Sequence, residues 1–179
     1  MPTSAGRSFV WHHAIARKNK TIFFEEAGPL LTRTLEGEAL ARAIEEQAPG
    51  SVVKRSESEI WVKPDKILDV CVTLKNPSGL DFSYLTSITA IDYVEHFELV
   101  YHLLSMRNNY QAVVKTLCPG RSEPSLPSVI DVWQGADLQE REIWDLMGIR
   151  FEGHPNLKRI LLWEGFDGHP LRKDYLDFQ

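Results

Sequence analysis

The stretch that decides the fold is TSITAIDYVEHFELVYHLLSMRNNYQAVVKTL, residues 86–117. Apolar and polar residues alternate from Thr86 to Tyr93, and aromatic and branched residues are frequent in 97–104 and 111–117. Such patterns are typical of strands that bury one face. The Arg-Asn-Asn sequence at 107–109 suits a hairpin turn. The stretch therefore predicts three consecutive antiparallel strands.

Two helices are predicted upstream of these strands. The first begins near Leu35 and ends at Pro49-Gly50, and its inner face would consist of Leu40, Ala43, Ile44 and Gln47. Short strands at 51–55 and 58–62 follow, and a second helix carries apolar residues from 67 to 74. Because helices and strands segregate, the predicted class is α+β, an antiparallel or mixed sheet covered on one face by the two helices. A capped helix and an extended, loop-rich C-terminal segment complete the prediction.

The length and composition suit one globular domain with tails. The chain has 179 residues, of which 43% are hydrophobic and 25% are charged. Residues 1–34 mix small, polar and basic residues without a sustained period, so we expect an N-terminal extension, partly disordered or laid over a partner. Residues 35–120 would form the α+β body. Residues 121–179 would hold a linker, the capped helix and a C-terminal docking segment.

Charge and hydropathy exclude several classes of protein. A net charge of -5 argues against nucleic acid as a partner, because phosphate binding relies on clustered Lys and Arg. No stretch approaches the roughly 18 apolar residues of a spanning helix, and the N-terminus lacks the apolar core of a signal peptide. We therefore expect a location in the cytosol or matrix. Cys71 and Cys118 lie in apolar surroundings and are predicted to be buried, reduced thiols.

A short acidic helix is predicted from Leu138 to Met147. Asp137 stands three residues before Glu140, the spacing of a capping box at a helix start. Gly148 can adopt the positive φ that ends a helix. Arg141 and Asp145 are four residues apart and are predicted to pair, with a stabilisation of roughly 0.2 to 0.5 kcal/mol.

After this helix one pattern occurs twice. Phe-acid-Gly-His-Pro fills residues 151–155 and again 166–170. In each copy Gly permits a sharp reversal, and the residue before Pro is pushed into an extended conformation. We term residues 151–175 the ribbon, whose positive ends are Lys158, Arg159, Arg172 and Lys173. Loops of this length inside a compact domain tend to be functional.

The acidic helix and the ribbon resemble a known family. Glu140-Arg141-Glu142, Asp145-Leu146-Met147, His154, Lys158 and Ile160-Leu161 stand at the spacings of the signature of the C-subunit family of NADH:quinone oxidoreductase, respiratory complex I. The block from Gly168 to Tyr175 resembles the C-terminal block of the same family. The resemblance covers about 35–175, and it is sharpest in the last third. The first 34 residues match nothing in the family pattern, and the tail after Tyr175 is short.

The resemblance implies a cofactor-free component of the peripheral arm, packed beside the quinone-site D-subunit and the iron-sulfur B-subunit. Electrons would pass from NADH through FMN and iron-sulfur centres of partner subunits to quinone, coupled to proton translocation. The chain would be needed for assembly and stability of the complex. It would lie peripherally on the cytoplasmic side of the cell membrane, attached only through the complex. The sequence agrees, because it has neither four closely spaced cysteines nor a Gly-rich nucleotide loop.

No catalytic, cofactor-binding or metal-binding residue is expected in this chain. The residues expected to contact adjoining subunits or to lock the ribbon internally are Glu140, Arg141, Glu142, Asp145, His154, Pro155, Lys158, Arg159, His169, Pro170, Arg172, Lys173, Asp174 and Tyr175. Trp133, Trp144 and Trp163 are expected to anchor the C-terminal segment to the body or to a partner.

Three alternatives remain open. In a stand-alone hydrolase, an acid-base or metal site would be built from Glu140, Glu142, Asp145 and His154. His154 and His169 could be metal ligands, although no nearby cysteine or closely spaced second histidine accompanies either. The chain could also be the homologous component of a membrane-bound hydrogenase, a formate hydrogenlyase or a plastid-type complex.

Overall fold

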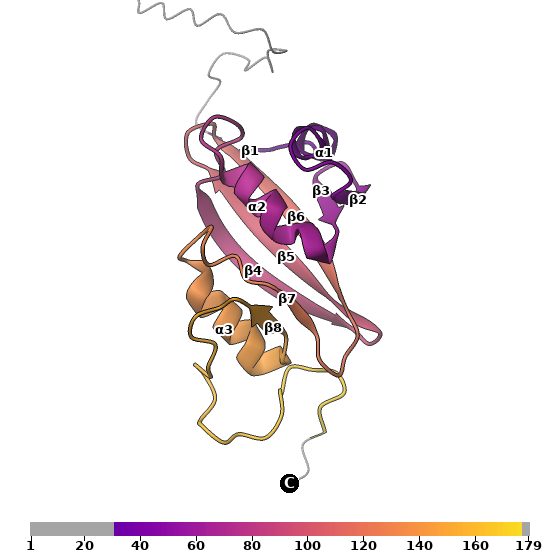
Figure 1. Cartoon of the computed structure of the whole chain (residues 1–179), viewed down its shortest axis with the longest axis vertical. Coiled ribbons are helices and arrows are strands. Elements are labelled where there is room, and N and C mark those ends of the chain that lie inside the picture. Colours follow the sequence, from indigo (N-terminus) through magenta and orange to yellow (C-terminus); the bar gives the residue numbers. More distant parts are fainter. Residues whose placement is uncertain (1–30, 177–179) are drawn as a thin grey trace, which may run out of the picture.

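A six-stranded mixed sheet forms the centre of residues 31–176, the part of the chain that this computed structural model describes (Figure 1). The strands are β1 (Arg33–Thr34), β2 (Val52–Arg55), β3 (Glu59–Val62), β4 (Tyr84–Tyr93), β5 (His96–Ser105) and β6 (Tyr110–Pro119). Their order is β2-β3-β6-β5-β4, and β1 also pairs with β6. The predicted strands at 86–117 are confirmed as the antiparallel strands β4, β5 and β6.

The inner face of the sheet follows the alternation in the sequence. On β5 the alternate residues Phe97, Leu99, Tyr101 and Leu103 belong to the hydrophobic core, as expected for one face of a strand, while Glu98 and Val100 on the other face are buried as well. On β4 the register shifts between Leu85 and Ser87, which is a bulge. Because a bulge changes the phase of the alternation, Leu85 and Ile88 both reach the core although they are three residues apart.

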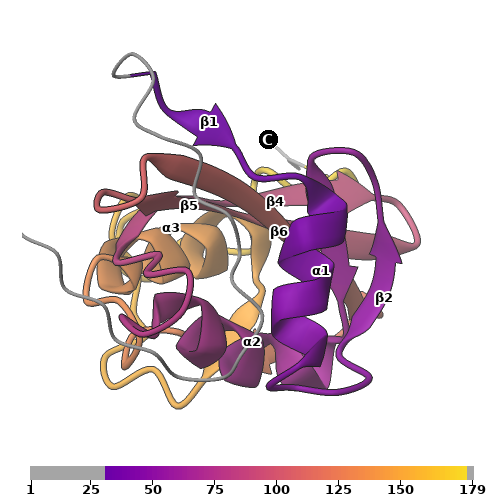
Figure 2. The ribbon, with the colours of Figure 1, turned by 90° about the horizontal axis from the view of Figure 1, so that it is seen from above.

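The helices cover one face of the sheet. They are α1 (Gly37–Glu45), a short 3-10 turn η1 (Pro64–Lys66) that leads into α2 (Ile67–Lys75), and α3 (Ala136–Met147). In the view of Figure 2, all three α-helices lie on the same side of the sheet. The α+β class and the covered face are confirmed. The third helix joins the first two, packs against β4 and contributes Ala136, Ile143 and Met147 to the same core.

Two local predictions need correction. Helix α1 buries Leu40, Ala41 and Ile44, whereas Gln47 is exposed beyond the last helical residue. Arg33 and Thr34, which were assigned to the N-terminal extension, form a strand parallel to β6. Residues 1–30 lie outside the described part of the chain, so the expectation of a partner-bound extension stays a prediction.

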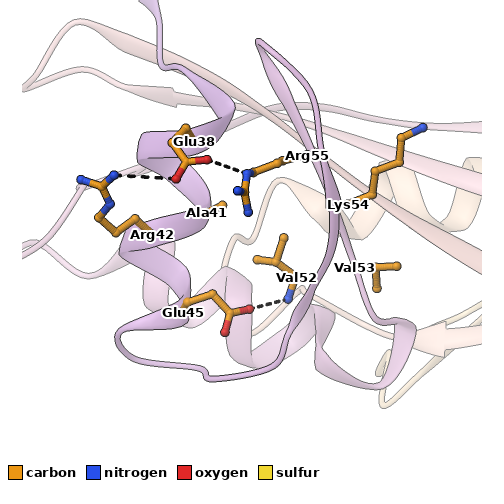
Figure 3. A pocket seen from close by; sticks show the side chains of 8 residues that line it. All are labelled: Glu38, Ala41, Arg42, Glu45, Val52, Val53, Lys54 and Arg55. Atoms are coloured by element: carbon orange, nitrogen blue, oxygen red, sulfur yellow. Dashed lines mark hydrogen bonds and ion pairs between the residues drawn. The ribbon is translucent and has the colours of Figure 1, made fainter.

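Helix α1 also lies beside β2, the edge strand of the sheet, and side chains of α1 bond to it (Figure 3). The Glu45 carboxylate accepts hydrogen bonds from the backbone N–H of Gly50 at 2.6 Å and of Val52 at 2.9 Å. These two donors lower the pKa of Glu45. The groove of about 390 Å³ between α1 and β2 is lined by charges that pair with each other, since Glu38 contacts both Arg42 and Arg55. These contacts hold α1 against β2, so the groove is part of the packing of the fold.

A second, two-stranded parallel sheet brings the linker and the start of the ribbon together. It consists of β7 (Ser125–Pro127) and β8 (Arg150–Glu152), and Leu126 and Phe151 from it are buried. Cys71 and Cys118 are free and buried, as predicted. Within residues 31–176, no helix combines the length and hydropathy that crossing a membrane requires. Figure 1 shows the ribbon looping outward beside α3.

Candidate functional site

The ribbon is fixed to α3 through one buried carboxylate. The side chain of Asp145 has an exposed fraction of 0%. Its Oδ2 accepts three backbone N–H groups, from residues 160, 161 and 162, at 3.0, 2.8 and 3.0 Å. Its Oδ1 accepts the Nη1–H of Arg159 at 2.7 Å. Burial alone would raise the pKa of Asp145, but the amide donors and Arg159 outweigh it and hold the pKa at about 2. Asp145 is thus a permanently charged anchor for the ribbon.

Arg159 extends this anchor to the second turn of the ribbon. Its Nη2 donates to the carbonyl oxygens of Phe166 at 2.7 Å and Gly168 at 3.1 Å. The guanidinium also lies 5.8 Å from the ring centre of Trp144 and 5.7 Å from that of Phe166. A planar guanidinium with several donors can bridge such separate acceptors, which an ammonium group could not do with equal geometry. Of the two ways in which the charge cluster was expected to act, Arg159 shows the internal lock.

Arg141 does not pair with Asp145, so this prediction was wrong. The Arg141 side chain donates instead to the backbone carbonyls of Lys158 at 3.2 Å and Arg159 at 3.3 Å. The physical reason is competition, because four donors from the ribbon already occupy the Asp145 carboxylate. An exposed pair at helical spacing, at a few tenths of a kcal/mol, is too weak to displace them.

The two histidines of the repeated pattern attach the ribbon to opposite ends of α3. Nδ1 of His154 accepts the N–H of Asn156 at 3.1 Å, and its Nε2 lies 3.3 Å from the carbonyl oxygen of Asp137 in the first turn of α3. Nδ1 of His169 lies 2.9 Å from the carbonyl oxygen of Asp145, near the end of α3. Equivalent positions of the repeat therefore bind one helix at two points. The positive φ of Gly153 and of Gly168, 83° and 82°, confirms the predicted sharp reversals.

Gly148 makes room for the second of these contacts. It ends α3 with a φ of 72°, as predicted, and its N–H donates to the carbonyl of Trp144. A Cβ at this position would lie 2.5 Å from Cδ2 of His169. Glycine is required here both for the backbone conformation and for the approach of the imidazole ring.

A network of ion pairs fixes the far end of the ribbon to the sheet. Arg121 donates to both carboxylate oxygens of Asp92, at 2.6 and 2.9 Å, and from Nε to Asp174 at 3.0 Å. Arg172 binds Asp174 as well, at 2.9 Å, and the N–H of Lys173 donates to Asp92 at 2.9 Å. The hydrogen bonds from Arg121 lower the pKa of Asp92 to about 2 and hold that of Asp174 well below its usual range. Asp92 and Arg121 were absent from the predicted site, because 29 residues of sequence separate them.

The predicted capping box was wrong. Helix α3 starts at Ala136, and its N-cap residue is Gly135, which has no side chain that could cap the helix. Glu140 points inward with an exposed fraction of 0%, and it accepts hydrogen bonds from the Ser128 hydroxyl and the Val129 N–H. Burial raises the pKa of Glu140 to about 7, against the opposing effect of these two donors. Glu142 of the signature lies exposed.

The four candidate hydrolase residues do not converge. Asp145 binds ribbon amides, His154 binds the start of α3, and Glu140 faces the core. None of these groups or Glu142 shares a hydrogen bond with another of the four. Within residues 31–176 no three His, Cys, Asp or Glu side chains group as metal ligands. In the described part of the chain these four residues therefore do not form one acid-base or metal site.

The ribbon exposes several large apolar side chains among charged ones. The apolar ones are Ile160, Leu161, Trp163, Leu171 and, just beyond the ribbon, Leu176, and Leu138 on α3 is exposed as well. Lys158, Lys173 and Pro155 are exposed too, whereas Arg172, Pro170 and Tyr175 are half-buried. Trp163 is 69% exposed and makes a T-shaped contact with Phe166 at a centroid distance of 4.7 Å. Trp133, by contrast, is buried, and its indole N–H donates to the carbonyl of Phe82. This bond anchors the C-terminal segment to the body.

Comparisons with known proteins agree on one family. Residues 60–177 match the family model described as respiratory-chain NADH dehydrogenase, 30 Kd subunit. The second NADH-quinone oxidoreductase C-subunit of Rhizobium meliloti is 44% identical over 117 residues, which cover 64% of this chain and 63% of that protein. The NADH-quinone oxidoreductase C-subunit of Roseiflexus sp. is 39% identical over 140 residues, which cover 76% of this chain and 80% of that protein. The chain thus spans less than two thirds of the Rhizobium relative.

A solved structure is similar in fold as well as in sequence. It is a chain in the structure of the membrane-bound sulfane sulfur reductase, an archaeal respiratory membrane complex. The TM-score is 0.63 at 33% sequence identity, and the match covers 79% of this chain and 86% of that chain.

Proposed function

Because this chain belongs to the family of the respiratory-chain NADH dehydrogenase 30 Kd subunit, we propose that it is the docking C-subunit of an NADH:quinone oxidoreductase. In this role it has no active site of its own, and it is needed for assembly and stability of the complex. Its partners are the other components of the complex, chiefly the quinone-site D-subunit and the iron-sulfur B-subunit. It reaches the cytoplasmic side of the cell membrane through them.

One observation carries this proposal, namely a ribbon that hydrogen bonds fix to α3 and that exposes large apolar side chains among charged ones. Asp145, Arg159 and the two histidines bind backbone groups and fix the path of the ribbon. The large side chains of Leu161, Trp163, Leu171 and Leu176 remain exposed. Exposed apolar patches rimmed by charge mark protein interaction sites, and a preformed segment binds without an ordering cost. This combination favours docking to another subunit.

The electron-transfer chemistry is proposed to lie in partner subunits. The whole sequence holds two cysteines, whereas an iron-sulfur cluster needs about four thiolate ligands. Cys71 on α2 and Cys118 on β6 are buried, and burial raises the pKa of both thiols. FMN and the iron-sulfur centres would therefore be held by neighbours, which pass electrons from NADH to quinone and couple this to proton translocation.

The experiment that tests this proposal introduces negative charge at two exposed apolar residues of the ribbon, Leu161 and Trp163. In the full complex, Leu161→Glu combined with Trp163→Glu should reduce the share of this chain that co-migrates with the peripheral arm on a native gel at least tenfold. The fold should persist, because both side chains point away from the core. Met106→Glu is the matched control, since Met106 is exposed to the same degree, 69%, on the hairpin between β5 and β6. Normal assembly of the double variant would exclude the ribbon as the docking surface.

A second candidate is the equivalent component of a different membrane complex. The observation in its favour is the similarity to a chain of the sulfane sulfur reductase complex at 33% identity. Membrane-bound hydrogenase, formate hydrogenlyase and plastid-type complexes belong to the same alternative. Identification of the proteins that co-purify with the chain from detergent-solubilised membranes separates these cases. An NADH-oxidising module among them supports the first candidate, and a hydrogenase or sulfur-reducing module supports the second.

A further inference from the structure

The inner face of α3 carries a second carboxylate, which the docking function does not use. Glu140 has an exposed fraction of 0%. Its Oε2 accepts the hydroxyl of Ser128 at 2.6 Å, and its Oε1 accepts the N–H of Val129 at 2.8 Å. Ser128 Oγ in turn accepts the N–H of Ile130 at 3.2 Å. These bonds join α3 to the segment that follows β7.

Among residues 31–176, no positive charge compensates this carboxylate. Glu140 forms no ion pair with any residue of 31–176, in contrast to Asp92 and Asp145. Its own helix contributes the acidic Asp137, α2 contributes Cys71, and β5 contributes Tyr101. Lys75 on α2 and Arg141 on α3 direct their charges to backbone carbonyls instead. An ionised, unpaired carboxylate in such surroundings is strongly unfavourable.

The interior next to Glu140 is polar but neutral. The hydroxyl of Tyr101 is buried and has no hydrogen-bond partner among the described residues. Burial raises the pKa values of the Tyr101 hydroxyl and the Cys71 thiol well above their usual ranges, so both stay protonated at neutral pH. The Glu140 carboxyl is thus the group in this cluster whose charge can change near neutrality.

We propose that Glu140 is a proton-linked latch, which holds α3 on the body of the protein when it is protonated and loosens this joint when it ionises. A second contact between α3 and the body lies beside Glu140: the Gln139 side chain accepts the N–H of Ile88 on β4 at 2.5 Å. The ribbon is bound to α3 through Arg141 and Asp145. A looser joint therefore frees the end of the ribbon that is bound to α3, while the far end stays bound to Asp92 on β4. This inference does not depend on which complex the chain serves.

The sign and size of the effect follow from linkage. A carboxyl whose pKa is near 7 in the closed state and near 4.5 when exposed binds more protons when closed. The closed joint is therefore favoured at low pH and loses stability as pH rises through about 7. Between pH 6 and pH 8 the ratio of closed to open joints should fall about tenfold.

Amide hydrogen exchange on the full chain tests the latch. The N–H groups of Val129 and Ile88 are bonded to side chains of α3, so their protection reports closure of the joint directly. After correction for intrinsic exchange, their protection factors should fall about tenfold from pH 6 to pH 8. Glu140→Gln should abolish this fall, whereas Glu142→Gln, on the exposed face of the same helix, should retain it.

A second variant guards against failure of the first to fold. Ser128→Ala removes a donor that favours the ionised carboxylate, so the fall in protection between pH 6 and pH 8 should become larger than in the wild type. Protection factors in the wild type that do not change with pH would overturn the proposal. An equal fall in the Glu140→Gln variant, or no larger fall in Ser128→Ala, would do so as well.

Discussion

Asp145 and Glu140 show how neighbouring carboxylates on one helix acquire opposite properties. Asp145 accepts three amides and a guanidinium, which keep its pKa at about 2, while Glu140 has two neutral donors and a pKa of about 7. Neither side chain has exposed surface, but Glu140 lies deeper in the protein, and this desolvation raises its pKa. At Asp145 three amides and a guanidinium outweigh the smaller cost of burial, so depth and donors together cause the difference. One residue therefore stays charged under all physiological conditions, and the other does not.

Replacement of Asp145 by Asn should destabilise the chain by about 3 kcal/mol at pH 7, because Arg159 and a ribbon amide lose their charged acceptor in a buried setting. Asp145 has a folded pKa below its ordinary 3.8. Its contribution is therefore present above about pH 4 and is lost as pH falls towards 2. Urea unfolding at a series of pH values should show the difference between variant and wild type shrinking over that range.

The exposed Glu142 provides the control for this prediction, since Glu142→Gln should change the free energy of unfolding by less than about 0.5 kcal/mol. A difference between Asp145→Asn and wild type that stays constant down to pH 2 would show that the carboxylate charge is not the stabilising feature.

At the scale of elements, the end of α3 can be tested through glycine. Gly148→Ala combines an unfavourable positive φ with a Cβ that would meet the His169 ring at 2.5 Å. We expect a loss of about 1 to 3 kcal/mol in the free energy of unfolding, together with release of the second turn of the ribbon. Chemical denaturation measures the first effect, and proteolysis within 160–175 measures the second.

Gly135, at the other end of α3, is the matched control. Its φ is -64° and a Cβ there meets nothing within 4 Å. Gly135→Ala should be neutral or slightly stabilising. A similar loss in both variants would mean that α3 tolerates no alanine at its ends, and that the contact with His169 is not the cause.

Sequence patterns predicted those elements that depend on local features alone, such as the alternation of apolar and polar residues or a glycine at a helix end. The strands β4, β5 and β6 follow alternation, and Gly148 follows from helix termination. The capping box failed because Asp137 and Glu140 have the spacing of a cap and equally that of one helical turn. Which of the two applies depends on Ser128, a tertiary neighbour that no local pattern indicates.

The contacts that hold the ribbon were mostly beyond local reasoning. The sequence marked Asp145, Arg159, His154 and His169 as important, but it did not indicate which groups they bind. Asp92 and Arg121 were missed altogether, since their partner Asp174 is more than 50 residues from Arg121. Ion pairs across such separations are set by the folded topology, and a single sequence carries no signal for them.

At the scale of the whole molecule, the sheet and its three helices form a platform on which the ribbon is displayed. Inward polar clamps come from α3 at one end and from β4 and Arg121 at the other. The ribbon between these contacts exposes Leu161, Trp163 and Leu171. Under the proposed docking function, a chain with two buried cysteines contributes to an electron-transfer complex by positioning other subunits.

A photo-crosslinking amino acid at position 163, introduced into the full chain within its native membrane complex, tests this central claim most directly. Trp163 is the most exposed large apolar side chain of the ribbon, at 69%, so the proposed docking predicts that this side chain contacts a neighbouring subunit. The account predicts a covalent adduct to another component of the respiratory complex, with position 106 as a reference on the far hairpin. A complex that contains the chain but yields no adduct from position 163 would contradict the account.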